Sequence, residues 1–143
     1  LFRSNRSNYA ALNVVPTGTQ EMSIYTTPFR RFTLRMDGFA SVRAGADPAE
    51  LVTHPVRFKG ADLWVNYSTS AGGVLQTELQ NPDGKPIDGF SLAENLPLTG
   101  DAIEQRVGWK NQRDLSALEG RTVRLRFVLQ EADVFALRFG GPA

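Results

Sequence analysis

The side chains that could do chemistry in this sequence are few, and the first to consider is the single histidine. Nucleophilic hydrolysis needs a base held against an activated hydroxyl or thiol. His54 is the only imidazole, the chain has no cysteine, and no Gly-x-Ser-x-Gly motif occurs. Because Pro55 favours an extended backbone at the preceding residue, we interpret His54 as a structural or surface residue.

Carboxylates are the second candidates, since cleavage of a glycosidic bond uses two of them about 5–10 Å apart. The candidate carboxylates are Glu50, Glu78, Asp101, Glu104, Glu131 and Asp133. Their surroundings mark no pair, and arginines such as Arg124, Arg126 and Arg138 are natural cross-strand partners for them. We therefore predict no catalytic residue, and keep a small stand-alone glycan-cleaving enzyme as an alternative.

A tryptophan is the third candidate, because sugar rings stack on flat aromatic side chains while polar neighbours bind the hydroxyls. Alternation along the predicted strand 63–68 places Leu63, Val65 and Tyr67 on one face. Trp64 then lies on the opposite, polar face, which a core tryptophan would not choose. Trp109, in contrast, shares the parity of apolar neighbours and is predicted to be buried.

Basic residues add a possible stripe on the sheet surface, which could meet an acidic glycan, an adjoining domain or only solvent. The predicted ligand-binding residues are Trp64, Asn66, Ser68, Arg124 and Arg126. The competing interpretation of Trp64 is a surface that docks on a neighbouring domain.

No cofactor is predicted. A structural calcium ion is an open alternative, with oxygen ligands drawn from Asp83, Asp88, Glu131 and Asp133, although no loop has the ligand ladder of an EF-hand.

Composition narrows the partners further. The 143 residues include 16 basic and 15 acidic side chains, a formal charge of +1 that does not fit a generally electropositive nucleic-acid binder. No apolar run reaches the ~18 residues of a membrane-spanning helix. The absence of cysteine, with the resemblance described below, favours a secreted or periplasmic bacterial protein. The partners we expect are a polysaccharide or oligosaccharide and a neighbouring catalytic domain in a longer chain, with no nucleic acid and no membrane.

The elements that must position these side chains are short strands. Segments rich in β-branched and aromatic residues alternate with Gly, Pro, Asn and Asp. The predicted strands are 11–15, 21–27, 29–36, 40–44, 51–58, 63–68, 74–80, 103–109, 121–130 and 133–139. The strand 121–130 shows the pattern best, with Val123, Leu125, Phe127 and Leu129 on one face.

Turn signals punctuate these strands. Ala71-Gly72-Gly73 indicates a hairpin between 63–68 and 74–80, and Asn81-Pro82-Asp83-Gly84 a tight turn. The segment 112–118 is the one helical candidate, with Asp114 as its cap and Gly120 after its end. The sequence predicts an all-β fold, an antiparallel, jelly-roll-like β-sandwich of about ten short strands and one short helical turn. Residues 1–8 form a flexible lead-in and 9–143 the sandwich domain, with 9–35 alternatively a remnant of a preceding domain.

From about position 35 the order of motifs resembles a known module. The segments that carry the resemblance are 34–42, 51–53, 65–73, 82–90, 107–110, 114–118, 123–129 and 132–139. They are similar to the C-terminal β-sandwich of bacterial proteins related to glycoside hydrolase family 32, in which the sandwich follows a five-bladed propeller. Residues 15–18 and 21–25 resemble the last propeller blade of those proteins.

The resemblance covers roughly three quarters of the chain and implies a module rather than an activity. The propeller that carries the catalytic carboxylates in such hydrolases does not lie within these residues, so none of its active-site residues can be assigned here. We therefore predict a non-catalytic carbohydrate-binding accessory module of a larger carbohydrate-active protein. The alternatives are a structural docking domain that stabilises a catalytic propeller, and the small glycan-cleaving enzyme considered above.

Overall fold

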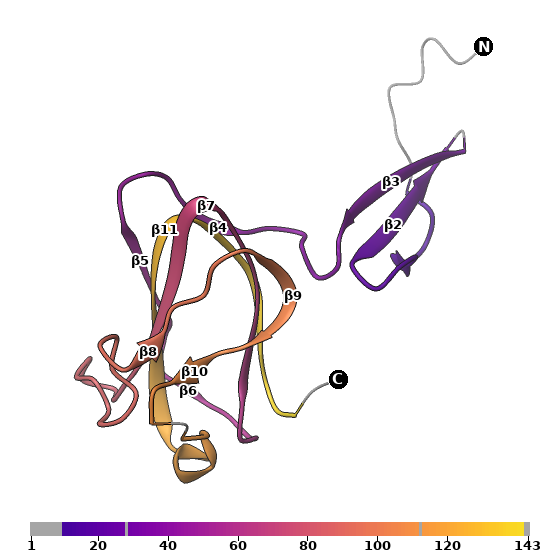
Figure 1. Ribbon diagram of the computed structural model, residues 1–143. Helices are drawn as coiled ribbons and strands as arrows, with labels where there is room; N and C mark the ends of the chain where they lie inside the picture. The colour runs from indigo at the N-terminus through magenta and orange to yellow at the C-terminus, as the bar shows by residue number, and fades with distance from the viewer. Residues whose placement is uncertain (1–9, 28, 112, 142–143) are drawn as a thin grey trace. The chain divides into compact units, whose positions relative to one another are not determined.

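The computed structural model describes residues 10–27, 29–111 and 113–141, and the chain divides into two compact units, Leu1–Phe39 and Ala40–Ala143 (Figure 1). The predicted lead-in 1–8 lies outside the described residues. In the described part of the chain, no helix has the length and apolar character needed to cross a membrane.

The first unit contains one antiparallel sheet in the order β1-β2-β3, formed by β1 (Val15–Pro16), β2 (Glu21–Thr26) and β3 (Arg30–Arg35). Its register places Met22 opposite Leu34 and Ile24 opposite Phe32, so one face of the sheet is apolar. On the other face, Arg31 donates hydrogen bonds to Ser23 and Glu21. The apolar face is incompletely covered, since Phe32 is 46% exposed.

The second unit is an all-β sandwich, as predicted. Its strands are β4 (Val42–Ala44), β5 (Ala49–Val52), β6 (Val56–Arg57), β7 (Leu63–Gln80), β8 (Asn95–Leu96), β9 (Asp101–Arg106), β10 (Gly108–Trp109) and β11 (Thr122–Phe139). Six of them share a sheet in which β11 lies between β4 and β7, β9 lies beside β7, and β5 and β6 pair with β11. A separate antiparallel pair joins β8 and β10.

Two long strands, β7 and β11, build both layers of the sandwich. They pair antiparallel along most of their lengths, from Arg124 opposite Gln80 to Phe139 opposite Leu63. Figure 1 shows each strand rising, bending over near its middle and descending on the other side. The first half of β7 and the second half of β11 therefore form one layer, and the remaining halves form the other.

This bend corrects the predicted hairpin at Ala71-Gly72-Gly73. The segments before and after these residues do not pair with each other, because both pair with β11. The bend is a close approach of two backbones: a Cβ on Gly73 would overlap the carbonyl oxygen of Glu131. Glu131 itself has a positive φ of 44° at a register shift in β11. Irregularities of this kind allow one strand to pass from one layer to the other.

The core lies between the two layers, and the predicted alternation is confirmed. Val123, Leu125, Phe127 and Leu129 are each at most 1% exposed, and Trp109 is 2% exposed. From the other layer, Leu63, Val65 and Tyr67 are buried as predicted. Phe58 stacks on Phe139, with ring centroids 4.2 Å apart.

The predicted strands 121–130 and 133–139 are one continuous strand, β11, and the predicted strand 103–109 is divided into β9 and β10. Other differences from the predicted elements have local causes. The predicted strand 51–58 is split into β5 and β6, because Thr53 bonds Leu125 with both its backbone N–H and its hydroxyl, and Pro55 has no N–H to continue a ladder. The helical candidate is a short 3-10 helix, Ser116–Leu118, and Gly120 follows it with a φ of 74°. The short strand β8 was not predicted.

Candidate functional site

Trp64 does lie on the strand face opposite the core, but its side chain has partners there. Its indole Nε1 donates a hydrogen bond of 2.9 Å to the carbonyl of Gly140. The guanidinium of Arg138, its cross-strand neighbour on β11, lies 5.6 Å from the ring centroid in a cation–π contact. Arg138 is held in turn by an ion pair with Glu104. One face of the Trp64 ring is therefore partly covered by the guanidinium of Arg138.

Asn66 and Ser68, the two other predicted site residues of β7, are less exposed to solvent than their position on a polar strand face predicts. Asn66 is only 4% exposed, and Ser68 is half-buried opposite Asp133 of β11 and Asp101 of β9. Between them, Tyr67 points into the core and donates a hydrogen bond of 2.8 Å to the carbonyl of Thr99. Burial, assisted by the charge of Asp101, raises the pKa of the Tyr67 phenol above 10.0.

Arg126 is tied to two carboxylates. Its Nε and Nη2 bind the carboxylate of Glu50 on β5, and its Nη1 lies 3.2 Å from Oε1 of Glu78 on β7. Glu78 is 3% exposed and also accepts hydrogen bonds from Gln80 and from the backbone N–H of Leu92. The Arg126 hydrogen bonds lower the pKa of the Glu50 carboxyl below 4.5, and the same bonds raise the pKa of the arginine.

The predicted site residues do not form one group. Trp64, Asn66 and Ser68 occupy the first half of β7, whereas Arg124 and Arg126 lie opposite Gln80 and Glu78 in its second half. Because the strand bends between these halves, the two sets belong to different layers of the sandwich (Figure 1). Arg124 has a buried Nε with no hydrogen-bond partner among the described residues.

The candidate calcium ligands are likewise separate. Asp83 and Asp88 belong to the segment after β7, and Glu131 and Asp133 belong to β11. Glu131 accepts a hydrogen bond from Ser70, and Asp133 accepts one from Ser41 and pairs with Arg43. The described ranges contain no group of three or more His, Cys, Asp or Glu side chains placed to hold a metal ion.

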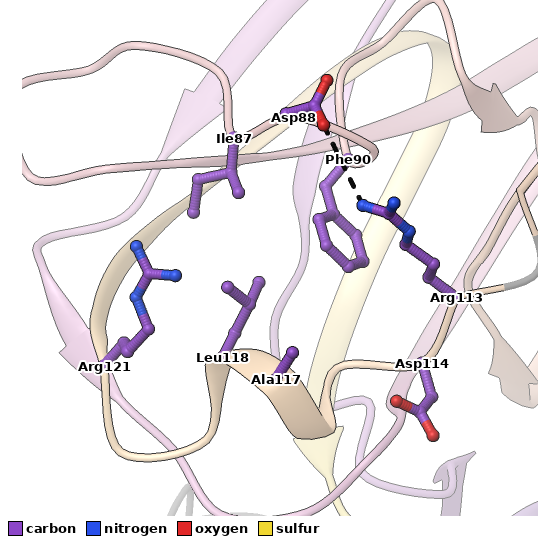
Figure 2. Close-up of a pocket in the computed structure, with 8 residues that line it drawn as sticks. All are labelled: Ile87, Asp88, Phe90, Arg113, Asp114, Ala117, Leu118 and Arg121. Atoms are coloured by element: carbon purple, nitrogen blue, oxygen red, sulfur yellow. Dashed lines mark ion pairs between the residues drawn. The ribbon is translucent and has the colours of Figure 1, made fainter.

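The structure shows instead an open hollow in the second unit, between the segment after β7 and the short helix. Its volume is about 620 Å³, within the roughly 300–1,000 Å³ typical of small-molecule sites. We call it the hollow; it is lined by Ile87, Asp88, Phe90, Arg113, Asp114, Ala117, Leu118 and Arg121 (Figure 2). Apolar side chains form its floor, and charged side chains stand around them.

One wall of the hollow is fixed to the edge of β7 by backbone hydrogen bonds. Leu79 donates to the carbonyl of Phe90 at 3.0 Å and accepts from the N–H of Ile87 at 2.9 Å. The predicted turn precedes this wall, and the side chain of Asn81 accepts from the N–H groups of Asp83 and Lys85. Phe90 is 3% exposed and packs edge-on against Trp109, so the floor is mainly aliphatic.

The other wall is the segment that contains the short helix. Oδ1 of Asp114 accepts hydrogen bonds from the N–H and hydroxyl of Ser116, the first residue of the helix. The N-cap position is Leu115, however, so Asp114 forms a turn before the helix rather than the predicted cap. These hydrogen bonds lower the pKa of the Asp114 carboxyl below 3.8. Asn111 joins the walls, since its side-chain amide donates to the carbonyl of Gly89 at 2.8 Å and accepts from the N–H of Arg113.

The charged groups at the hollow differ in how they are held. Figure 2 shows the Asp114 carboxylate pointing away from the other side chains and the Arg121 guanidinium standing apart from Asp88 and Arg113. Asp88 is fully exposed and pairs loosely with Arg113, at 3.9 Å. Arg121 is exposed and makes no side-chain hydrogen bond or ion pair with any residue that the structure describes. The hollow therefore offers an apolar floor with accessible cationic and anionic groups above it.

The residues of the hollow do not stand out as a group in the sequence. Asp114 is predicted there as a helix cap and Asp88 as a candidate calcium ligand, but neither as part of a pocket. The aliphatic floor gives no periodic signal, because Ile87 lies in an irregular segment and Leu118 ends a single short 3-10 turn far away in the chain. The turn at Asn81-Pro82-Asp83-Gly84 was the one sequence signal close to it.

Comparison with known proteins finds no matching family model, no matching curated protein and no matching solved structure.

Proposed function

We propose that the second unit is a non-catalytic carbohydrate-binding module of a larger carbohydrate-active protein, and that the hollow is its binding site. The observation that carries the proposal is the combination of an aliphatic floor with exposed hydrogen-bonding groups in a pocket of about 620 Å³. A sugar presents C–H groups on the faces of its ring and hydroxyls around its edge, which match such a surface. The resemblance to the sandwich of family 32-related proteins supports the same proposal.

The form of the hollow favours binding over hydrolysis. A glycosidase needs one carboxyl that stays protonated near neutral pH, which burial in apolar surroundings provides. The Asp88 side chain is fully exposed, and the pKa of Asp114 is lowered by its hydrogen bonds to Ser116. Neither carboxyl has the surroundings of a general acid.

The proposal is tested by closing the hollow with a bulky side chain. Ala117 is exposed, lines the hollow and lies in the short helix, so Ala117→Trp fills the space above the floor. Glu119 is exposed just after the same helix but does not line the hollow, so Glu119→Trp is the matched control. Retention of the full chain on insoluble and gelled polysaccharides is then compared for both variants and Trp64→Ala.

We expect retention of the wild type, the Glu119→Trp variant and the Trp64→Ala variant, and its loss in Ala117→Trp. Loss in Trp64→Ala with retention in Ala117→Trp would move the binding site to the strand face predicted from the sequence. If no polysaccharide retains the wild type, the protein is not a carbohydrate-binding module. Circular dichroism of each variant establishes that the fold is intact.

A second candidate function, docking on a neighbouring domain, is favoured by the first unit. Its sheet has an apolar face on which Phe32 is 46% exposed, and Met22 is the one buried apolar side chain among the described residues of this unit. A sheet with one apolar face is stable when another layer covers that face. The occupant that we propose is a neighbouring domain of the same longer protein.

Light scattering of the full chain tests this candidate. An uncovered apolar face promotes self-association, so we expect the wild type to self-associate and the Phe32→Lys variant to be more monomeric than the wild type. Arg30→Lys, at another exposed position of β3, is the control and changes little. A wild type that is monomeric at high concentration would contradict the docking function.

A further inference from the structure

We infer that the sugar bound in the hollow is acidic, and that its carboxylate or sulfate group binds to the guanidinium of Arg121. The inference rests on the proposed function, because it names the class of carbohydrate that the same hollow would take. Arg121 is not among the ligand-binding residues predicted from the sequence, whose two arginines are Arg124 and Arg126.

Arg121 differs from most arginines of the second unit in having no carboxylate beside it. Arg106 pairs with Asp62, Arg126 with Glu50 and Glu78, and Arg138 with Glu104. The side chain of Arg121 has no such partner within the described ranges. An unpaired, exposed guanidinium at the border of a pocket is free to bind an anion from solution.

The backbone around Arg121 is nevertheless well fixed. Its N–H donates to the carbonyl of Leu118 at 3.0 Å, and the N–H of Gly120 donates to the carbonyl of Phe58. The next residue, Thr122, begins β11 opposite Arg57. The guanidinium is therefore carried on a rigid base, which lowers the entropic cost of binding.

The chemistry of the guanidinium favours an anion over a hydroxyl. Its planar fork of N–H donors matches the two oxygens of a carboxylate or two of a sulfate group, and such charge-assisted pairs are stronger than neutral ones. The neighbouring Ile87 and Leu118 are apolar and reduce competition from water on one side of the group. A neutral sugar would leave this cation without a counter-ion.

The acidic groups of the hollow do not oppose this assignment. Asp114 points away from the other lining side chains and is occupied by Ser116, and Asp88 lies toward Arg113 (Figure 2). A sugar lying over the aliphatic floor can therefore place its anionic group at Arg121 and its hydroxyls near Asp88 and Arg113. This arrangement uses both the cationic and the anionic groups.

The experiment compares two pairs of polysaccharides that differ in charge but not in backbone. One pair is polygalacturonate and its methyl ester, and the other is a sulfated galactan and its desulfated form. Affinities of the full chain are measured by isothermal titration for the wild type, Arg121→Gln and Arg121→Lys. Arg43→Gln is the matched control, because Arg43 is 79% exposed and lies on β4, whose residues do not line the hollow.

We expect at least one acidic polymer to bind about tenfold or more tightly than its neutral partner, and added salt to weaken it. Arg121→Gln should abolish that preference, Arg121→Lys should retain part of it, and Arg43→Gln should leave it unchanged. Which acidic polymer binds distinguishes a carboxylate from a sulfate ligand.

Three results would overturn the inference. Equal binding of the acidic and neutral forms, blocked by Ala117→Trp, would remove the acidic ligand and leave the carbohydrate-binding function intact. A preference that survives in Arg121→Gln would assign the anion to another residue. Binding of no polysaccharide would end the inference and the proposed function together.

Discussion

The backbone N–H of Leu79 donates a hydrogen bond of 3.0 Å to the carbonyl of Phe90, and this contact joins the hollow to the sandwich. Leu79 is fully buried at the end of β7, so the position of the hollow's first wall follows the core. The accompanying bond from Ile87 to the carbonyl of Leu79 makes the attachment two-sided. The site is thus held by a strand of the core, which preserves its shape in the absence of ligand.

Loss of the Asn111 side chain should loosen the two walls. In Asn111→Ala the carbonyl of Gly89 and the N–H of Arg113 both lose a partner. We expect the free energy of unfolding to fall by about 1–2 kcal/mol, and the amides of residues 87–90 to exchange faster with solvent. Urea unfolding and hydrogen exchange measure these effects. Unchanged exchange in the segment would show that Asn111 does not join the walls.

The bend of the long strands makes a second prediction, about two adjacent glycines. A Cβ on Gly73 would overlap the backbone of Glu131, which cannot move without opening the bend. On Gly72 the nearest atom to an added Cβ is the flexible carboxylate of Glu131, at 3.5 Å. Gly73→Ala is therefore expected to lower the free energy of unfolding by about 3 kcal/mol or to prevent folding, whereas Gly72→Ala costs less than about 1 kcal/mol. Equal effects in denaturant unfolding would argue against the close approach.

Removal of Arg126 tests the polar network that this side chain forms with Glu50 and Glu78. Arg126→Met leaves the carboxylate of Glu78 buried without its cation, and breaking a buried pair in this way is strongly destabilising. Because Arg126 is partly exposed, we expect a loss of about 2 kcal/mol in urea unfolding. Adding Glu78→Gln should recover part of that loss. A double variant no more stable than Arg126→Met would mean that the two residues are not coupled.

The low pKa of Glu50 predicts how acid affects stability. The hydrogen bonds from Arg126 lower this pKa below its ordinary value of 4.5, so the folded state favours the ionised carboxyl. The resulting stabilisation is present above about pH 4.5 and is lost as the pH falls through the folded-state pKa. In Glu50→Gln, the decline of stability below this pH should become shallower.

Chemical unfolding over a series of pH values measures the effect of Glu50→Gln. Glu119→Gln is the control, because Glu119 is exposed and its side chain makes no hydrogen bond or ion pair within the described part of the chain. Parallel curves for the wild type and Glu50→Gln would contradict the role of Arg126 in holding this carboxylate.

The sequence predicted the parts of the fold that depend on alternation. Alternating apolar residues in the segment 121–130 predict a strand that is covered on one face. In the structure these residues lie in the core: Val123, Leu125, Phe127 and Leu129. Alternation could not distinguish a hairpin from a bent strand at Gly73, because that distinction depends on which partner each half pairs with. The partner is β11, far away in the sequence.

The candidate site was harder to predict for the same physical reason. The parity of Trp64 was predicted correctly, yet its contact with Arg138 depends on a register shift between Val134 and Ala136 that no periodicity reveals. The hollow depends on an irregular segment after β7 and a segment with one short 3-10 helix, which hydrogen bonds hold in place. Its residues become a site only when the pairing of Leu79 is known.

The most direct test of the hollow as the binding site is a nuclear magnetic resonance titration of the full chain with the polysaccharide fragment that binds most tightly. The chain has two tryptophans, so their indole N–H signals report separately on two places. Trp109 packs against Phe90 of the hollow, and Trp64 lies on an outer strand face beside Arg138. We predict that ligand shifts the Trp109 indole and the amides around Ile87 and Arg121, while the Trp64 indole stays in place. A shifted Trp64 indole with unchanged signals around the hollow would contradict this assignment.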